Sequence, residues 1–280
     1  MLKNVIVTCS NEKYGDFLIN HWLKSLKENV NLENIDVVVI DYGLNNFQKT
    51  QLLKKKVILF KGIKKYHIVN KRFFDSAKYL KNKSYDQILF IDGGDTIFQE
   101  DITHVFNKDK NTFRVVPLGM KVLFFEWFIF DNFEKKIKEK IWKIVKNKTV
   151  INAGVIFAPY NKFLSLCNDM EKLIKDKDAF GPDQIILNYH LYQEGFIFLD
   201  SKYNFMMSTE EKGFIVKKGI FYKPGGEKIA IVHNAGQMDF FRPIKNFGFG
   251  KEFNQIKHVI YNVKKTQYQI LCWYKKNFKD

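Results

Sequence analysis

The chain has 280 residues, of which 46% are hydrophobic, 16% aromatic and 27% charged. This composition excludes collagen-like, disordered and disulfide-scaffold proteins, because only five residues are proline and three are cysteine, and apolar residues are plentiful enough for a packed core. The formal net charge of +16 would suit a polyanion, but only three of the 46 basic residues are arginine, the side chain that reads bases and phosphates best. We therefore expect no nucleic-acid partner.

The N-terminal segment leads directly into a strand-like run and lacks the apolar stretch of a signal peptide. No segment approaches the roughly 20 apolar residues that a membrane-spanning helix needs. Cys9, Cys167 and Cys272 are too widely spaced for a Cys-x-x-Cys metal site and are odd in number, which favours reduced thiols. These features predict an intracellular, cytoplasmic protein.

The first half of the chain alternates apolar strand-like runs with helical patterns. Strands are predicted at residues 5–8, 35–40, 57–60 and 87–91, and helices at residues 16–26, 46–54 and 72–81. This alternation predicts an α/β domain with a mainly parallel central sheet. Ligands of such sheets bind at the carboxyl ends of the strands, so we expect residues 8–14, 41–44 and 92–95 on one rim.

The second half is less regular. A surface helix is predicted at residues 133–148, a strand at 152–158, a helix continuing to residue 173, a helix beginning near Pro182, and a strand at 229–233. No internal repeat or linker divides the chain, so one domain followed by a tail is the simplest organisation.

Asp92-Gly-Gly-Asp95, at the end of a predicted buried strand, is the sharpest chemical feature. Two carboxylates this close repel each other unless a cation lies between them. Their hard oxygens suit Mg²⁺ or Mn²⁺, which would in turn hold a diphosphate. In isolation the four residues also suit an ordinary tight turn, because Asp and Gly favour turns for conformational reasons.

Residues 88–98 resemble the strand-plus-DxD signature of GT-A glycosyltransferases, which use nucleotide-sugar donors. Further segments resemble, in the same order, motifs of the retaining glycosyltransferases of family 8. They are Asn152-Ala-Gly-Val-Ile, Asp183-Gln184 with Leu187-Asn188, and His233-Asn-Ala-Gly236, and residues 7–14 resemble the segment that lines the nucleotide base. The resemblance implies a single Rossmann-like GT-A domain over residues 1–250, followed by a basic, aromatic helical tail over residues 251–280.

Two positions depart from the family pattern. The acidic motif has two residues between its carboxylates instead of one, so either Asp92 keeps its role through a bulged turn or only Asp95 contacts a metal. Arg242-Pro243 follows the His motif later than the Lys-Pro that the family commonly has, which leaves its phosphate contact open.

The resemblance implies a divalent-metal site. Asp92, Asp95 and His233 would hold Mn²⁺ or Mg²⁺, with His233 binding through a neutral imidazole nitrogen. The alternative for His233 is a purely structural role.

The resemblance also implies a nucleotide-sugar site formed by Thr8, Tyr14, Arg72, Asp92, Gly236 and Arg242. Thr8 and Tyr14 would contact the base and ribose; alternatively, they are a strand end and a core aromatic residue. Arg72 would reach the diphosphate, the alternative being a surface ion pair.

Asn152, Asp183 and Gln184 would face the transferred sugar as the catalytic residues. A carboxylate and an amide beside the anomeric carbon could hold hydroxyls and stabilise oxocarbenium-like charge. For Asp183 the alternative is stabilisation of a helix N-terminus, since it directly follows Pro182.

The tail carries seven lysines and keeps helical apolar spacing through Ile256, Ile260 and Val263. Its lysines and its aromatic residues, among them Trp273 and Tyr274, favour peripheral attachment to the anionic inner face of the plasma membrane. An ordinary C-terminal helix docked on the core is the alternative.

Together with these features, the resemblance implies a metal-dependent hexosyltransferase. It would move a sugar from a nucleotide-diphosphate sugar, with UDP-hexose preferred, to a saccharide or lipid-linked acceptor in the synthesis of a bacterial surface glycan such as lipopolysaccharide. One alternative is a sugar-nucleotide nucleotidyltransferase, although residues 9–14 lack the Gly-rich basic loop expected of that class. The other is a non-enzymatic basic domain that binds membranes or polyanions.

Overall fold

A computed structural model describes residues 2–63, 65–121, 133–209, 213–236, 242 and 244–252, together with residues 263, 266, 267 and 270. The predicted tail over residues 251–280 therefore lies almost entirely outside the described residues, and its membrane role stays a prediction.

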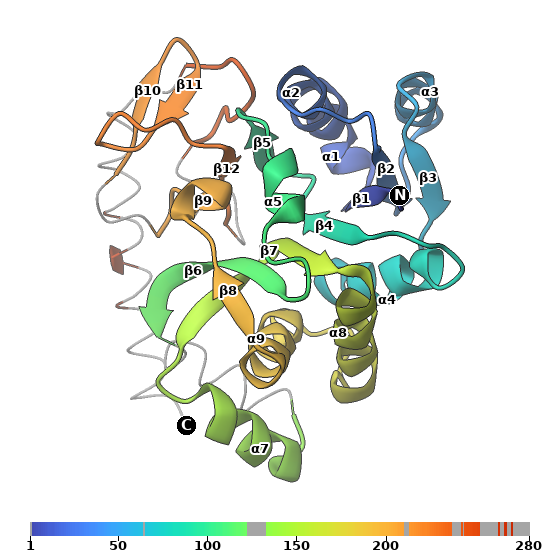
Figure 1. Cartoon of the computed structure of the whole chain (residues 1–280), viewed down its shortest axis with the longest axis vertical. Helices are drawn as coiled ribbons and strands as arrows, with labels where there is room; N and C mark the ends of the chain where they lie inside the picture. Colours follow the sequence, from blue (N-terminus) through green and yellow to red (C-terminus); the bar gives the residue numbers. More distant parts are fainter. Residues whose placement is uncertain are drawn as a thin grey trace.

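A seven-stranded sheet, in the order β3-β2-β1-β4-β7-β6-β8, forms the centre of the molecule (Figure 1). Its strands are β1 (Asn4–Ser10), β2 (Ile35–Asp41), β3 (Ile58–Lys61), β4 (Gln87–Ile91), β6 (Phe113–Lys121), β7 (Thr149–Pro159) and β8 (Phe196–Phe198). Strands β3, β2, β1 and β4 are parallel, whereas β7 is antiparallel to both of its neighbours. The predicted α/β fold with a mainly parallel central sheet is confirmed.

Helices cover both faces of this sheet. They are α1 (Glu12–Phe17), a π-helical segment (Leu18–Trp22), α2 (Leu23–Asn29), α3 (Asn46–Lys54), α4 (Ile68–Leu80), α5 (Thr103–Asn107), α7 (Lys135–Val145), α8 (Tyr160–Leu173) and α9 (Pro182–Glu194). In β4, Phe90 packs into the cluster that contains Phe163 of α8, while its neighbour Leu89 packs into the cluster on the opposite face with Trp22. A strand buried on both faces has a continuous apolar sequence, as β4 does.

A small three-stranded sheet brings distant segments to one edge of the central sheet. It contains β5 (Thr96–Phe98), β12 (Ile231–His233) and β9 (Phe205–Met206), and a separate hairpin is formed by β10 (Ile215–Lys217) and β11 (Ile220–Tyr222). In this small sheet His233 pairs with Thr96 on one side and with Met206 on the other. The pairing places the end of β12 directly beside the acidic loop that follows β4.

Several predicted boundaries differ from those observed. The helix predicted at residues 72–81 begins at Ile68, because the side chain of His67 caps it by accepting a hydrogen bond from Val69 N (3.4 Å). The helix predicted at residues 133–148 is shorter and spans α7. The strand predicted at residues 152–158 is longer and antiparallel, and β6 was not predicted at all.

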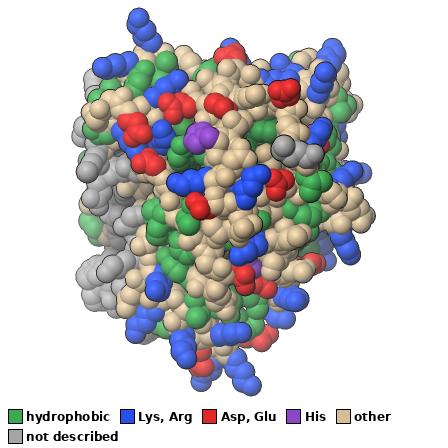
Figure 2. All heavy atoms as spheres, viewed as in Figure 1, with side chains coloured by type: hydrophobic (Ala, Val, Ile, Leu, Met, Phe, Trp, Pro, Cys, Tyr) green, Lys and Arg blue, Asp and Glu red, His purple; other side chains and the backbone are tan. Residues whose placement is uncertain are grey.

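The surface carries its positive charge in scattered form. Figure 2 shows Lys and Arg side chains spread over the visible face, with acidic side chains between them. On this face there is no continuous basic stripe of the kind that tracks a nucleic-acid backbone. Among the described residues, Cys9 and Cys167 are free thiols, and none of the described helices is long and apolar enough to cross a membrane.

Candidate active site

A cavity of about 530 Å³ opens at the carboxyl ends of β1 and β4, the edge at which the sequence predicts ligand binding. Because β7 is antiparallel to β4, its early residues also reach this edge, and Asp92 N donates to Gly154 O (2.9 Å). The predicted site residues that line the cavity are Tyr14, Arg72, Asp92, Asp95, Asn152, Asp183, Gln184, His233, Gly236 and Arg242.

Two carboxylates and an imidazole converge in the wall of this cavity. Asp92 follows β4, Asp95 precedes β5, and His233 ends β12. His233 Nε2 lies 3.6 Å from Asp92 Oδ2 and 3.5 Å from Asp95 Oδ1. The extra residue in the acidic motif therefore does not turn Asp92 away, and both carboxylates face the imidazole.

The residues of this cluster fit a divalent cation. One ligand atom from each of Asp92, Asp95 and His233 can be chosen so that all three lie within 4.8 Å of one another. His233 Nε2 is buried and has no hydrogen-bond partner among the described residues. A Cβ at position 154 would lie 2.4 Å from His233 Cε1 and 2.9 Å from Asp92 Oδ2, so Gly154 keeps this side open. Carboxylate oxygens with one imidazole nitrogen suit Mn²⁺ or Mg²⁺.

The charged side chains in this cluster keep one another ionised although they are buried. Burial alone would raise the pKa of Asp95, but His233 and Arg242 outweigh it and lower that pKa below its usual value. Burial alone would lower the pKa of His233, but Asp95 and Asp92 outweigh it and raise that pKa. The field that attracts a proton to His233 also attracts a metal cation, so the two compete for this position.

Arg72, on α4, connects the acidic cluster to a third carboxyl group. It forms an ion pair with Asp92, and its Nη2 atom lies 3.3 Å from both Asp183 Oδ2 and the carbonyl oxygen of Ala153. Arg72 is 7% exposed, so the alternative of a surface ion pair is wrong.

Asp183 lies in the first turn of α9, which begins after Gly181 with its left-handed φ of 100°. Burial is the largest influence on this carboxyl group and raises its pKa from 3.8 to about 6, although Arg72 acts in the opposite direction. Asp183 thus lies both at the helix N-terminus and in the cavity wall, and its catalytic role stays a prediction.

Gln184 and Asn152 have polar atoms engaged with β7. Gln184 Oε1 accepts from Ala153 N (3.1 Å) and its Nε2 donates to Ile151 O. Asn152 Oδ1 accepts from Gly154 N (2.8 Å). Both side chains line the cavity while being held by the backbone of the strand.

Tyr14 and Arg242 lie on the Asp95 side of the acidic cluster. The guanidinium carbon of Arg242 lies 5.6 Å from the centroid of the Tyr14 ring, and its Nη2 lies 3.3 Å from Asp95 Oδ2. Arg242 therefore reaches the acidic loop despite its late position in the sequence. Thr8, by contrast, is 1% exposed and lies behind Gly93, where an added Cβ would come within 2.5 Å of Thr8 Oγ1.

Sequence reasoning missed Asn204. Its Oδ1 lies 2.8 Å from His233 Nδ1, and its Nδ2 donates to Asn152 Oδ1 (3.2 Å). No motif marks Asn204, because it reaches the site through the pairing of β9 with β12. Gly154 belongs to the motif that begins at Asn152, but its steric role becomes visible only in the folded structure.

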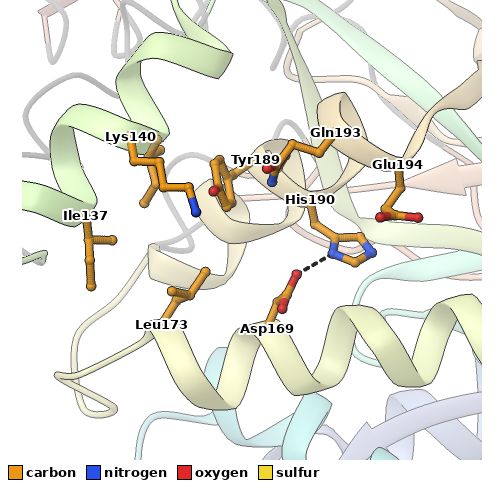
Figure 3. Close-up of a pocket in the computed structure, with 9 residues that line it drawn as sticks. Ile137, Lys140, Asp169, Leu173, Tyr189, His190, Gln193 and Glu194 are labelled. Carbon is orange, nitrogen blue, oxygen red and sulfur yellow. Dashed lines mark hydrogen bonds and ion pairs between the residues drawn. The ribbon is translucent and has the colours of Figure 1, made fainter.

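A second cavity of about 350 Å³ lies among α7, α8 and α9 (Figure 3). His190 Nδ1 lies 2.6 Å from Asp169 Oδ2, and Lys140 and Glu194 also line this cavity. None of the predicted site residues lines it.

Comparisons with known proteins agree with this arrangement. A search of curated proteins finds no significant match. Among solved structures, an active-site mutant of LgtC is similar with a TM-score of 0.58 at 16% identity, covering 93% of this chain and 95% of LgtC. GlyE of Streptococcus pneumoniae TIGR4 is similar with a TM-score of 0.55 at 18% identity, covering 96% of this chain and 64% of GlyE.

The bifunctional glycosyltransferase WbbM is similar with a TM-score of 0.56 at 17% identity over 86% of this chain, which spans 47% of WbbM. At these identities the likeness shows a shared fold. The sequence profile of Glycosyl transferase family 8 matches residues 5–240, which is most of the chain. The chain therefore belongs to glycosyl transferase family 8 and is a glycosyltransferase of the GT-A fold that uses a nucleotide sugar.

Proposed function

We propose that this enzyme transfers a hexose from a nucleoside-diphosphate sugar, with UDP-hexose as the preferred donor, in a reaction that depends on Mn²⁺ or Mg²⁺. The observation that carries the proposal is the convergence of Asp92, Asp95 and His233 in the wall of the cavity at the carboxyl ends of β1 and β4. Family membership supports a transferase over the nucleotidyltransferase and the basic binding domain considered from the sequence.

In this proposal Asp92, Asp95 and His233 hold the cation. When bound, the cation neutralises negative charge on the departing nucleoside diphosphate. Arg242 lies beside Asp95, with Nη2 3.3 Å from Asp95 Oδ2, and its partly exposed side chain could turn its guanidinium to a phosphate oxygen. Tyr14 lines the cavity with its ring centroid 5.6 Å from that guanidinium carbon, and it would stack on the nucleobase once Arg242 turns to a phosphate.

The sugar would lie beside Arg72 and Asp183. Asn152 and Gln184 also line the cavity and bond to the backbone of β7. Asp183 and Arg72 can hold sugar hydroxyls and orient the anomeric carbon, and the apolar lining residues Leu118 and Met206 help to exclude water, which would otherwise hydrolyse the donor.

The acceptor proposed from the sequence is a saccharide or a lipid-linked glycan of a bacterial surface. Its binding would complete the site from the open side of the cavity. Attachment of the tail to the membrane surface would bring the enzyme to a lipid-linked acceptor.

Thermal unfolding with UDP, GDP and CDP, each with and without Mn²⁺, tests the donor site on the wild type and on Asp95→Asn. A ligand that binds only the folded state raises the melting temperature by mass action. We expect the largest rise with UDP and Mn²⁺ together, and loss of the Mn²⁺-dependent part in Asp95→Asn. Equal shifts with and without Mn²⁺, or no shift with any nucleotide, would contradict the proposal.

A further inference from the structure

The imidazole of His233 must present a lone pair to bind a cation. A neutral imidazole carries its proton on one nitrogen and a lone pair on the other. His233 Nε2 faces carboxylate oxygens of Asp92 and Asp95 at 3.6 and 3.5 Å, and these acceptors favour a proton on Nε2. A proton on Nε2 would compete with the cation, so a hydrogen-bond acceptor opposite Nδ1 would favour cation binding.

Asn204 is in position to do this. It is 2% exposed and directly precedes β9, whose parallel pairing with β12 aligns Met206 with His233. Its Oδ1 atom lies 2.8 Å from His233 Nδ1. An amide oxygen can only accept, so this contact requires the proton on Nδ1.

The orientation of the Asn204 amide is itself fixed by the backbone. Gly154 N–H can only donate, and it donates to Asn152 Oδ1 at 2.8 Å. Asn152 Oδ1 is therefore an acceptor, so Asn204 must turn its Nδ2 toward it, at 3.2 Å. That leaves Asn204 Oδ1 facing His233, and every bond in the series has one donor and one acceptor.

We infer that Asn204 is a positioning residue that holds His233 in the Nδ1–H tautomer, through hydrogen bonds that begin at the amide of Gly154 and pass through Asn152. The Nε2 lone pair is thereby directed at the point where Asp92 and Asp95 converge. The inference rests on the cation role proposed above for His233.

The tautomer can be read in the wild type without any substitution. In two-bond ¹H–¹⁵N spectra of protein labelled on histidine, an N–H nitrogen and a bare nitrogen resonate far apart. A His233→Gln variant assigns the resonance, and the pH is raised until the His233 shifts stop changing. We expect Nδ1 protonated and Nε2 bare; a proton on Nε2 would overturn the inference.

Removal of the acceptor gives the second test. In Asn204→Ala we expect His233 to move its proton to Nε2, and the affinity for Mn²⁺ alone, measured by electron paramagnetic resonance, to fall about 10–100-fold. Asn204→Asp keeps an oxygen opposite Nδ1–H, so it should retain the Nδ1–H tautomer. Asn70→Ala removes an equally buried asparagine that bonds only to backbone carbonyls of the 177–179 loop, and it should leave the tautomer and the Mn²⁺ affinity unchanged.

The outcomes separate this inference from the proposed function. If the wild type binds Mn²⁺ and Asn204→Ala binds it equally tightly, the positioning role is wrong and the metal site stands. If the wild type binds no Mn²⁺, both are wrong. An equal loss of affinity in Asn70→Ala and Asn204→Ala would show a general effect on folding and would also overturn the positioning role.

Discussion

Two buried histidines in this molecule share nearly all their local features but differ in what surrounds them. His233 and His190 are 1% and 2% exposed, and each has Nδ1 close to a side-chain oxygen, at 2.8 and 2.6 Å. Each has a buried Nε2 without a hydrogen-bond partner among the described residues. Only around His233 do two carboxylates converge on that free nitrogen.

The two histidines differ in which of their ring nitrogens the acidic side chains approach. At His190, which lines the second cavity, the carboxylate of Asp169 pairs with Nδ1 (Figure 3). The His190 imidazole also packs edge-on against Phe113, with ring centroids 5.7 Å apart. At His233 the Nδ1 partner is the neutral amide of Asn204, which leaves both carboxylates available to a cation. A buried imidazole is thus a poor marker of a metal site by itself, and the convergence of carboxylates on its free nitrogen is the better one.

The largest contrast in activity should come from neutralising one carboxylate beside each histidine. We expect Asp95→Asn to lower transferase activity at least about 100-fold, since loss of a mere hydrogen-bond partner of a metal ligand already costs 10–100-fold. Asp169→Asn should leave activity near that of the wild type. Activity would be followed as release of the nucleoside diphosphate. Equal losses in the two variants would show that both histidine sites serve the reaction and would remove the contrast.

A methyl group placed between the ligands should have the next largest effect. In Gly154→Ala the new Cβ would lie 2.4 Å from His233 Cε1 and 2.7 Å from Asn152 Oδ1, so the imidazole must move. We expect Mn²⁺ affinity to fall at least about tenfold. Gly225→Ala is the matched control, because a Cβ there meets nothing within 4 Å. Unchanged Mn²⁺ affinity in Gly154→Ala would mean that the ligands bind the cation from the other side.

Much of this arrangement could be predicted from the sequence. The continuous apolar run of β4 predicts a strand buried on both faces, and the Asp and Gly residues that follow it predict a turn. Together they locate the end of the sheet at which ligands bind. The contribution of Asn204 could not be predicted, since it depends on the pairing of β9 with β12, which brings Asn204 to His233, 29 residues further along the chain. Thr8 is predicted to contact the base, but it is 1% exposed and covered by Gly93. A glycine in a sequence fits a tight turn as well as a close backbone contact, so the sequence alone does not reveal this covering.

Asp183 and Asp169 differ in how deeply their carboxyl groups are buried. Asp183 is 5% exposed and burial raises its pKa to about 6, while the Asp169 side chain is 35% exposed. Because folded Asp183 holds its proton more tightly than the unfolded chain, the free energy of unfolding falls as the pH rises from about 4 to about 6. Asp183→Asn removes this loss, so above pH 6 it should be more stable than the wild type by about 3 kcal/mol.

Urea denaturation at pH 4 and at pH 8 measures this difference. At pH 4 the carboxyl group is mostly protonated in the folded state, so variant and wild type should have similar stability. A stabilisation that is the same at both pH values would contradict the burial argument. Activity of Asp183→Asn should fall at the same time, since the carboxylate lines the donor cavity.

The smallest effect should come from removing the partner of His190, and it should fall on stability and not on activity. Asp169→Ala removes the acceptor of His190 Nδ1 and leaves a buried donor unpaired, which should lower the free energy of unfolding by about 1–3 kcal/mol. Mn²⁺ affinity and transferase activity at a temperature where the variant is folded should not change, because His190 takes no part in the acidic cluster. Asp169→Asn keeps an acceptor oxygen and should restore most of the lost stability. A loss of activity in Asp169→Ala without a loss of stability would reverse the comparison, since it would make the second cavity part of the reaction.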